Sequence, residues 1–341
     1  MPAPDVSACT TPAPAWCVTS SRGLRTAARA AAALVTAALC ALLPTRPLLA
    51  QAAPRPATIA ARLGYPADAK LLILHADDLG VAHSVNAASL DALERGVISS
   101  ASIMVPTPWV TEVADWARAH PDHDLGLHLT LTSEWKHYRW GTVAPATEVP
   151  TLLDSAGTLP RDTRVVAERA AVREVERELR AQVERARALG IRPTHLDSHM
   201  GALFTTPALY ATLVRVARDY RLPFLATRLP DGSLPAGVRP DRDVVLDAVV
   251  DVRPEVPPDQ WKTFYLKTIR ELKPGLTELI VHLGSDDAEL QAITVDHEPW
   301  GSAWRQRDAD VLRSPEFRQA LKDNNVVLVR WKELQRLVGA P

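Results

Sequence analysis

The sequence predicts an α/β fold, built as a single barrel-like (β/α) domain that follows a signal peptide. Two observations support this prediction. Short apolar runs alternate with amphipathic stretches along most of the chain, as is typical of parallel strands covered by helices. The part that follows the first fifty-odd residues, roughly 290 residues long, also has the usual size of one α/β barrel. We therefore assign residues 1–53 to a leader and residues 54–341 to the domain.

The leader has the order of features expected for export. Basic residues between Arg22 and Arg29 precede an alanine- and leucine-rich run that extends to Leu43, and small residues follow up to Ala53. This order is typical of a secretory signal peptide, and the apolar run is short for a membrane span. We expect cleavage near Ala53, a periplasmic or extracellular protein, and no membrane span afterwards; an uncleaved anchor is the alternative.

Composition excludes several classes of function. Cys9, Cys17 and Cys40 all lie in the leader, so the domain itself has no thiol for catalysis, metal binding or a disulfide. The chain carries 39 basic and 40 acidic residues without a basic tract, which argues against a nucleic-acid partner.

The expected elements follow one another along the domain. Eight apolar runs predict strands at Leu71–His75, Val97–Val105, Leu125–Leu131, Thr194–Asp197, Pro223–Ala226, Val244–Val249, Leu279–His282 and Val326–Val329. The clearest helix is Val165–Leu189, which is apolar on one face and ends at Gly190. Shorter helices are expected at Val85–Arg95 with Ser84 as its cap, Val110–Ala119, Pro207–Tyr220, Pro258–Leu272 and Ser314–Asn324. Long loops are expected at residues 133–162 and 284–308.

Ionisable side chains lie at or near the carboxyl ends of four of these strands. Asp77 and Asp78 follow the first strand, and His128, His199 and His282 lie late in or just after three others. In a parallel α/β fold these ends meet on one face, where active sites are built. The placement predicts one site formed by residues far apart in the sequence.

Two histidines and a carboxylate are a common set of ligands for a catalytic divalent metal ion. The second of two adjacent aspartates can then face the attacking water as a general base. His75, His195 and Asp197 fit either of two roles, orienting the ligands through hydrogen bonds or purely structural packing.

Four stretches resemble, in order, the motifs of a known family. They are LLILHADDLGVAHSVNAASLDALERGVISSASIMV, DLGLHLTLT, RPTHLDSHMGALFTTPALY and TELIVHLGS, and VPTLLDSAGTLP adds a weaker match before the central helix. Their content and order are similar to those of the YdjC-like carbohydrate deacetylases, the family of chitooligosaccharide deacetylase. The resemblance implies a barrel-like domain related to polysaccharide deacetylases, and hydrolysis of the N-acetyl group of N-acetylglucosamine units.

Carried over by position, the resemblance implies that Asp77 is the general base and His282 the general acid. It implies that Asp78, His128 and His199 bind one divalent metal ion. Zinc suits two imidazoles and a carboxylate, magnesium prefers oxygen-rich sites, and the resemblance leaves both open.

The sequence departs from the family's pattern at two points. Leu283 follows His282 where the family often has His-Pro-Gly, which affects the loop of the expected acid. Met200 and Gly201 stand where the family often has further histidines, which removes polar groups near the sugar. The substrate is therefore left open between an oligosaccharide and an envelope glycan that contain N-acetylglucosamine.

Four other residues have weaker assignments. Arg228 follows a strand candidate and is expected either to bind substrate or to form a surface salt bridge. Trp135, in the first long loop, is expected either to stack on a sugar ring or to pack onto the barrel. Arg307 and Asp310 match an Arg-x-x-acid pattern and are expected to be structural.

Two further functions fit the same residues. One is a metal-dependent phosphoesterase or amidohydrolase, which often holds two metal ions about 3.5 to 4 Å apart, so metal stoichiometry separates it from a deacetylase. The other is a barrel that binds glycans without cleaving them, which chelator-sensitive acetate release would exclude. The oligomeric state is not predicted.

Overall fold

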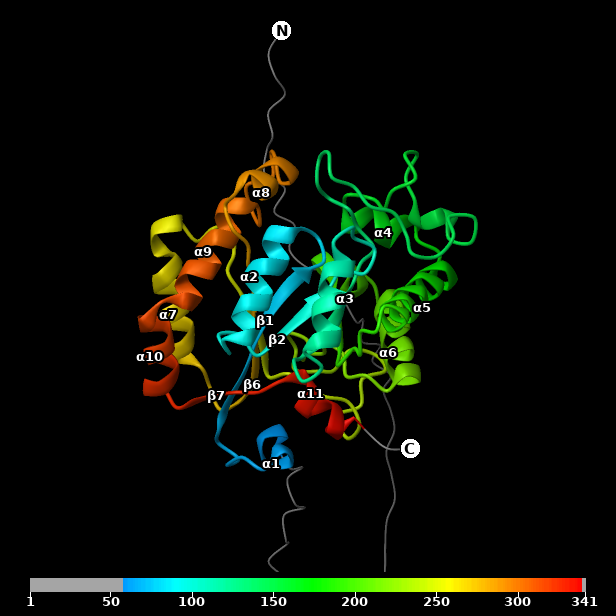
Figure 1. The fold of residues 1–341 in the computed structure, drawn as a ribbon. Coiled ribbons are helices and arrows are strands. Elements are labelled where there is room, and N and C mark those ends of the chain that lie inside the picture. The colour runs from blue at the N-terminus through cyan, green and yellow to red at the C-terminus, as the bar shows by residue number, and fades with distance from the viewer. Residues whose placement is uncertain (1–57, 339–341) are drawn as a thin grey trace, which may run out of the picture. The chain divides into compact units, whose positions relative to one another are not determined.

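A computed structural model describes residues 58–338, so the expected leader lies outside the described residues. The described chain is an α/β half-barrel, and its sheet has seven strands, all parallel (Figure 1). The strands are β1 (Lys70–Leu79), β2 (Ser100–Ile103), β3 (Leu125–Leu129), β4 (Leu196–Ser198), β5 (Ala248–Asp251), β6 (Gly275–Val281) and β7 (Val326–Leu328).

Strand β1 is the centre of the sheet. The strand order is β4-β3-β2-β1-β6-β5, and β7 also pairs with β1. β6 pairs with β1 from Lys70 to Ala76, whereas β7 pairs with its first residues and β2 with its last. The carboxyl end of β1 therefore lies between β2 and β6.

The eighth expected strand, Pro223–Ala226, is corrected by the structure. This segment lies between β4 and β5 and forms a single parallel bridge on each side. Phe224 pairs with Leu196 of β4, and Thr227 pairs with Leu246, which precedes β5. Pro223 has no N–H to donate, so the segment pairs at single points and does not extend into a ladder. The sheet is consequently a half-barrel, an incomplete form of the barrel-like domain that the eight apolar runs predicted.

Helices lie around the outside of the strands. They are α1 (Ile59–Leu63), α2 (His83–Glu94), α3 (Val110–Ala119), α4 (Thr163–Arg169), α5 (Val172–Ala188), α6 (Pro207–Tyr220), α7 (Trp261–Glu271), α8 (Ala288–Ile293), α9 (Ser302–Arg313), α10 (Pro315–Asp323) and α11 (Trp331–Leu334), with short 3-10 turns η1 (Pro150–Leu152), η2 (His199–Phe204), η3 (Pro258–Gln260) and η4 (Gln335–Leu337). In Figure 1 the neighbours α7, α9 and α10 lie to the left of the strands, and α5 and α6 lie together to the right.

Two helix predictions need correction. The single helix expected at 165–189 is two helices, because Ala170 and Ala171 are extended and the N–H of Ala171 donates to Oγ1 of Thr151 in the preceding loop. Ser84 does not cap α2; Ala82 is the cap residue, and the Ser84 hydroxyl instead donates to the carboxylates that follow β6. The helices predicted at Val110–Ala119 and Pro207–Tyr220 are confirmed at the same residues.

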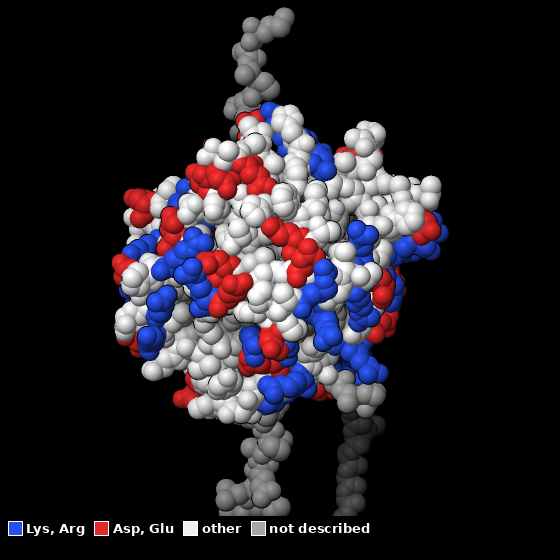
Figure 2. Space-filling view, viewed as in Figure 1, with Lys and Arg blue, Asp and Glu red and all other residues white. Residues whose placement is uncertain are grey.

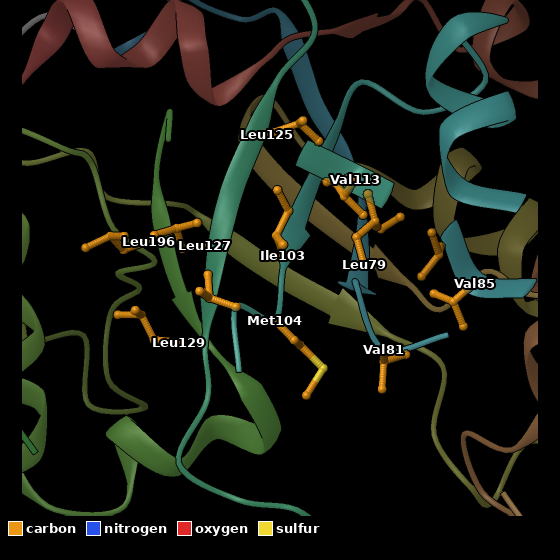
Figure 3. Packing of buried hydrophobic residues seen from close by; sticks show 14 of the residues in the cluster. Leu79, Val81, Val85, Ile103, Met104, Val113, Leu125, Leu127, Leu129 and Leu196 are labelled. Carbon is orange, nitrogen blue, oxygen red and sulfur yellow. The ribbon is translucent and has the colours of Figure 1, made fainter. Parts of the chain in front are cut away.

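The core lies between the strands and the helices that cover them. Leu79, Ile103 and Leu127 come from three adjacent strands, and Val85 and Val113 from α2 and α3 pack beside them (Figure 3). All five are fully buried. Burial of each such side chain contributes about 1.5–3 kcal/mol, so the strand ends that carry the ionisable residues are held rigidly.

The surface is mixed in charge. On the face shown in Figure 2, lysine and arginine are interspersed with aspartate and glutamate, in agreement with the absence of a basic tract in the sequence. Among the described residues, no helix is both long and apolar enough to cross a membrane.

Candidate metal centre and active site

The structure brings the predicted site residues together at the carboxyl end of the sheet. Asp77 and Asp78 lie in the last part of β1, and His128 lies in β3. His199 begins η2 directly after β4, and His282 follows β6. The convergence predicted from the strand ends is therefore confirmed.

A β-bulge places both aspartates in the site. The pairing of β1 with β2 shifts register between Ala76 and Leu79, and Asp78 has a positive φ of 69°. A bulge lets consecutive side chains face the same side of a strand. As a result, Asp77 Oδ2 and Asp78 Oδ1 lie 3.7 Å and 3.4 Å from the same nitrogen, His128 Nε2.

Asp78, His128 and His199 form a compact donor set. Asp78 Oδ1 lies 3.4 Å from His128 Nε2 and 3.3 Å from His199 Nδ1, and all three residues are buried. Within the described residues this oxygen has no hydrogen-bond partner, which is costly for a buried carboxylate unless a cation or a water binds it. The set therefore fits a divalent metal ion.

Each of these two histidines also contacts a second carboxylate. His128 Nδ1 lies 2.7 Å from Asp197 Oδ1, and His199 Nε2 lies 3.0 Å from Glu134 Oε2. These carboxylates fix the tautomer that leaves the other ring nitrogen facing Asp78. Asp197 has the orienting position that was one of the two roles expected for it. Glu134 was missed, because it lies in the irregular loop after β3 and carries no strand-end signal.

Charge pairing dominates the electrostatics of these groups. Burial alone would raise the pKa of Asp78, but Arg305 and His199 outweigh it and hold this pKa well below its usual range. Burial likewise opposes protonation of His199, yet Glu134 and Asp78 raise its pKa to about 10. The carboxylates of the centre thus stabilise positive charge on the groups beside them.

Arg305 is a second residue that sequence reasoning missed. Its guanidinium is almost fully buried and lies 2.6 Å from Asp78 Oδ2, the oxygen that does not face the histidines. Arg305 and Asp308 also match the Arg-x-x-acid pattern, two residues before the pair that the sequence analysis singled out. Arg307 packs over the Trp261 ring and Asp310 accepts from Gln306, so these two fit the structural role expected for them.

His282 lies beside the same oxygen of Asp77 that faces His128. Its Nε2 is 4.0 Å from Asp77 Oδ2, and its backbone N–H donates to Asp308 Oδ2 at 2.9 Å. Asp308 also accepts from Trp261 and Tyr265, so the segment that carries His282 is anchored in the core. Burial lowers the pKa of His282 to about 4, and Arg305 adds to this effect.

The two residues expected at the substrate have different surroundings. Trp135 is 1% exposed, packs against Trp140 and has the Arg305 guanidinium over its ring, which favours the packing role over sugar contact. Arg228 is exposed and donates to the carbonyl of Gly232 within its own loop. Arg305 thus contacts both Trp135 and Asp78 and links this tryptophan to the site. The hydrogen bond of Arg228, by contrast, lies within a surface loop.

The fold and the site define an α/β half-barrel protein with a buried aspartate-histidine centre at the carboxyl end of its strands. The chain belongs to the family described as YdjC-like protein, whose model matches residues 71–323.

Named relatives and a solved structure agree with this membership. The carbohydrate deacetylase of Thermus thermophilus is 35% identical over 263 residues, which cover 74% of this chain and 90% of that protein. The carbohydrate deacetylase of Geobacillus stearothermophilus is 29% identical, with 78% and 98% covered. A crystal structure from Enterococcus faecalis, of a protein whose name proposes cleavage of cellobiose phosphate, superposes with a TM-score of 0.66. It is 24% identical and covers 78% of this chain and 99% of its own, and it supports the fold alone.

Proposed function

We propose that this protein is a metal-dependent hydrolase that removes the N-acetyl group from an amino sugar within an oligosaccharide or an envelope glycan. The observation that carries the proposal is the pair of adjacent aspartates on the β1 bulge. Asp78 belongs to the metal-binding set, whereas Asp77 Oδ2 faces both His128 and His282 at 3.7 Å and 4.0 Å. Membership of the YdjC-like family and relatives named carbohydrate deacetylase support the same reaction.

The metal site fits the chemistry of amide hydrolysis. A divalent cation held by Asp78, His128 and His199 would polarise the acetamide carbonyl and lower the pKa of a water molecule. Asp77 would accept the proton of that water as it attacks. Its Oδ2 faces the donor set, whereas its Oδ1 lies 3.1 Å from His75 Nε2.

The amine must leave with a proton, and His282 is the proposed donor. A pKa of about 4 keeps the His282 imidazole neutral near pH 7 in the free protein. His282 therefore has to gain its proton after Asp77 has taken one from water, and the 4.0 Å between Asp77 Oδ2 and His282 Nε2 allows such a transfer with a small movement.

Acetate release from a panel of N-acetylated sugars tests the proposal. The purified protein should release acetate, a chelator should abolish the release, and added Zn²⁺ or Mg²⁺ should restore it. One metal ion per chain is expected; two would favour a phosphoesterase or amidohydrolase. If the protein with its metal bound released no acetate from any of the sugars, the proposed reaction would be refuted.

Asp77→Asn tests the base directly. The substitution should lower kcat by about a hundredfold or more, because general-base catalysis contributes on this scale, and it should leave metal content unchanged. Asp115→Asn, on the exposed face of α3, is the matched control and should behave as wild type. Full acetate release by the Asp77 variant would remove the base assignment.

Export is proposed on the order of features in residues 1–53 alone. The amino-terminal sequence of the protein recovered from the periplasm or medium should begin near residue 54. Recovery of the uncut chain from the cytoplasm would contradict export.

A further inference from the structure

His75 is a buried histidine beneath the active site to which the proposed mechanism gives no task. It lies in β1 two residues before Asp77, so the two side chains start from the same face of the strand. Its side chain is completely buried, and its Nε2 hydrogen-bonds with Ser102 Oγ at 3.1 Å. The same nitrogen lies 3.1 Å from Asp77 Oδ1 and 3.2 Å from Asp197 Oδ2.

The two oxygens of Asp77 therefore have different surroundings. Oδ1 is close to His75 Nε2 and accepts from the Ser102 hydroxyl at 3.4 Å. Oδ2 faces His128 and His282 on the site side. Contacts with Oδ1 fix the rotation of the carboxylate about its Cβ–Cγ bond, and this rotation determines where the lone pairs of Oδ2 point.

Asp197 connects His75 to His128, a member of the metal-binding set. Its Oδ2 lies beside His75 Nε2, and its Oδ1 accepts from His128 Nδ1 at 2.7 Å. One imidazole nitrogen thus lies between the carboxylate of the base and the carboxylate that orients a ligand. Movement of His75 would change both at once.

The His75 ring packs against another aromatic ring in the core. It packs edge-on against the His195 ring at 5.0 Å, and His195 stacks on Trp331 at 5.1 Å with an angle of 18° between the rings. His195 also lies directly against Gly126, where a Cβ would come within 2.3 Å of the ring. These ring contacts limit how far the His75 imidazole can turn.

We propose that His75 is a positioning residue for the deacetylation: its Nε2–H holds Oδ1 of Asp77 so that Oδ2 faces the reacting water, and it links this base to the Asp197–His128 pair. The inference rests on the proposed role of Asp77. It assigns to His75 an effect on turnover that is separate from metal binding and from folding.

Two variants separate positioning from packing. His75→Leu removes the N–H, whereas His75→Gln places an amide N–H close to the position of Nε2. His75→Leu should lower kcat about 10- to 100-fold with KM and metal content within about twofold, because a small misplacement of a catalytic group costs this much. His75→Gln should recover at least about a fifth of wild-type kcat. Equal kcat losses in both variants, or wild-type kcat in His75→Leu, would overturn the proposal.

A second measurement does not depend on activity. In protein labelled with ¹⁵N-histidine, the ring signals of His75 are assigned by their loss in His75→Gln. The Nε2–H signal should be protected from exchange and should shift in Asp77→Asn and in Asp197→Asn, but not in the control Asp115→Asn. An unchanged signal in Asp77→Asn would overturn the proposal even if His75→Leu fails to fold.

The acetate assay and the His75 signal together distinguish this inference from the proposed function. A protein that shows the shifted His75 signal but releases no acetate would support the contact of His75 with Asp77 and refute the deacetylase. A protein that releases acetate with an unchanged signal would support the deacetylase and refute His75 as the residue that holds its base.

Discussion

Glu278 makes the stability of this protein depend on pH in an unusual direction. It lies in β6 with 1% of its surface exposed. Its Oε2 accepts from the Trp331 indole at 3.0 Å, but its Oε1 has no hydrogen-bond partner within the described residues. Burial raises the pKa of Glu278 to about 8, and nearby Asp197 and Asp77 add to this effect. The folded protein therefore keeps a proton on Glu278 that the unfolded chain releases.

The sign and size of the pH effect on stability follow from this difference in protonation. Between pH 4.5 and about 8 Glu278 is protonated in the folded state and ionised in the unfolded state, so its contribution to the free energy of unfolding falls as pH rises through this window and is constant above it. A pKa raised from 4.5 to about 8 corresponds to on the order of 5 kcal/mol, since one pKa unit equals about 1.4 kcal/mol. We expect a smaller measured value, about 2–5 kcal/mol, because the folded chain relaxes around the charge.

Glu278→Gln removes the ionisation and keeps an oxygen for the Trp331 indole. Urea unfolding followed by tryptophan fluorescence should give similar stabilities for wild type and variant at pH 5. At pH 9 the variant should be more stable by about 2–5 kcal/mol. Glu168→Gln, in exposed α4, is the control and should follow wild type at both pH values. A difference between wild type and Glu278→Gln that is the same at pH 5 and pH 9 would refute the reasoning.

Three further outcomes are expected. Glu134→Ala removes the carboxylate that holds His199 Nε2 and should weaken metal affinity about 10- to 100-fold in a calorimetric titration, and unchanged affinity would contradict its orienting role. Arg305→Met leaves the partner carboxylate of this buried pair uncompensated and should lower the free energy of unfolding in chelator by about 3–5 kcal/mol; a loss below about 1 kcal/mol would contradict the pairing. Gly126→Ala forces a Cβ against the His195 ring and should cost about 1–3 kcal/mol in thermal unfolding, whereas an unchanged Tm would show that the ring can move.

Much of the site could be predicted because its residues follow apolar strands. Asp77, Asp78 and His128 occupy β1 and β3, whose burial on both faces produces continuous apolar runs in the sequence. Parallel strands then bring their carboxyl ends together whatever the length of the chain between them. The convergence therefore needed only the strand positions, and small errors in strand bounds did not matter.

The residues that could not be predicted do not lie at the end of a strand. Glu134 lies in an irregular loop and Arg305 on a helix, and only their contacts with His199 and Asp78 reveal their task. The break at Ala170 and Ala171 was equally hidden, since alanine is a strong helix former and the interruption depends on a hydrogen bond to Thr151 in a distant loop.

The pairing of β1 with β6 and β7 has a consequence for how the chain is made. Lys70 pairs with Gly275 on one side and with Val326 on the other, so the central strand acquires these neighbours only after most of the polypeptide has been synthesised. Contacts this distant in sequence form slowly. Until β7 and the α11 helix that follows it have left the ribosome, the packing beneath Asp77 and Asp78 lacks Trp331, the ring on which His195 stacks.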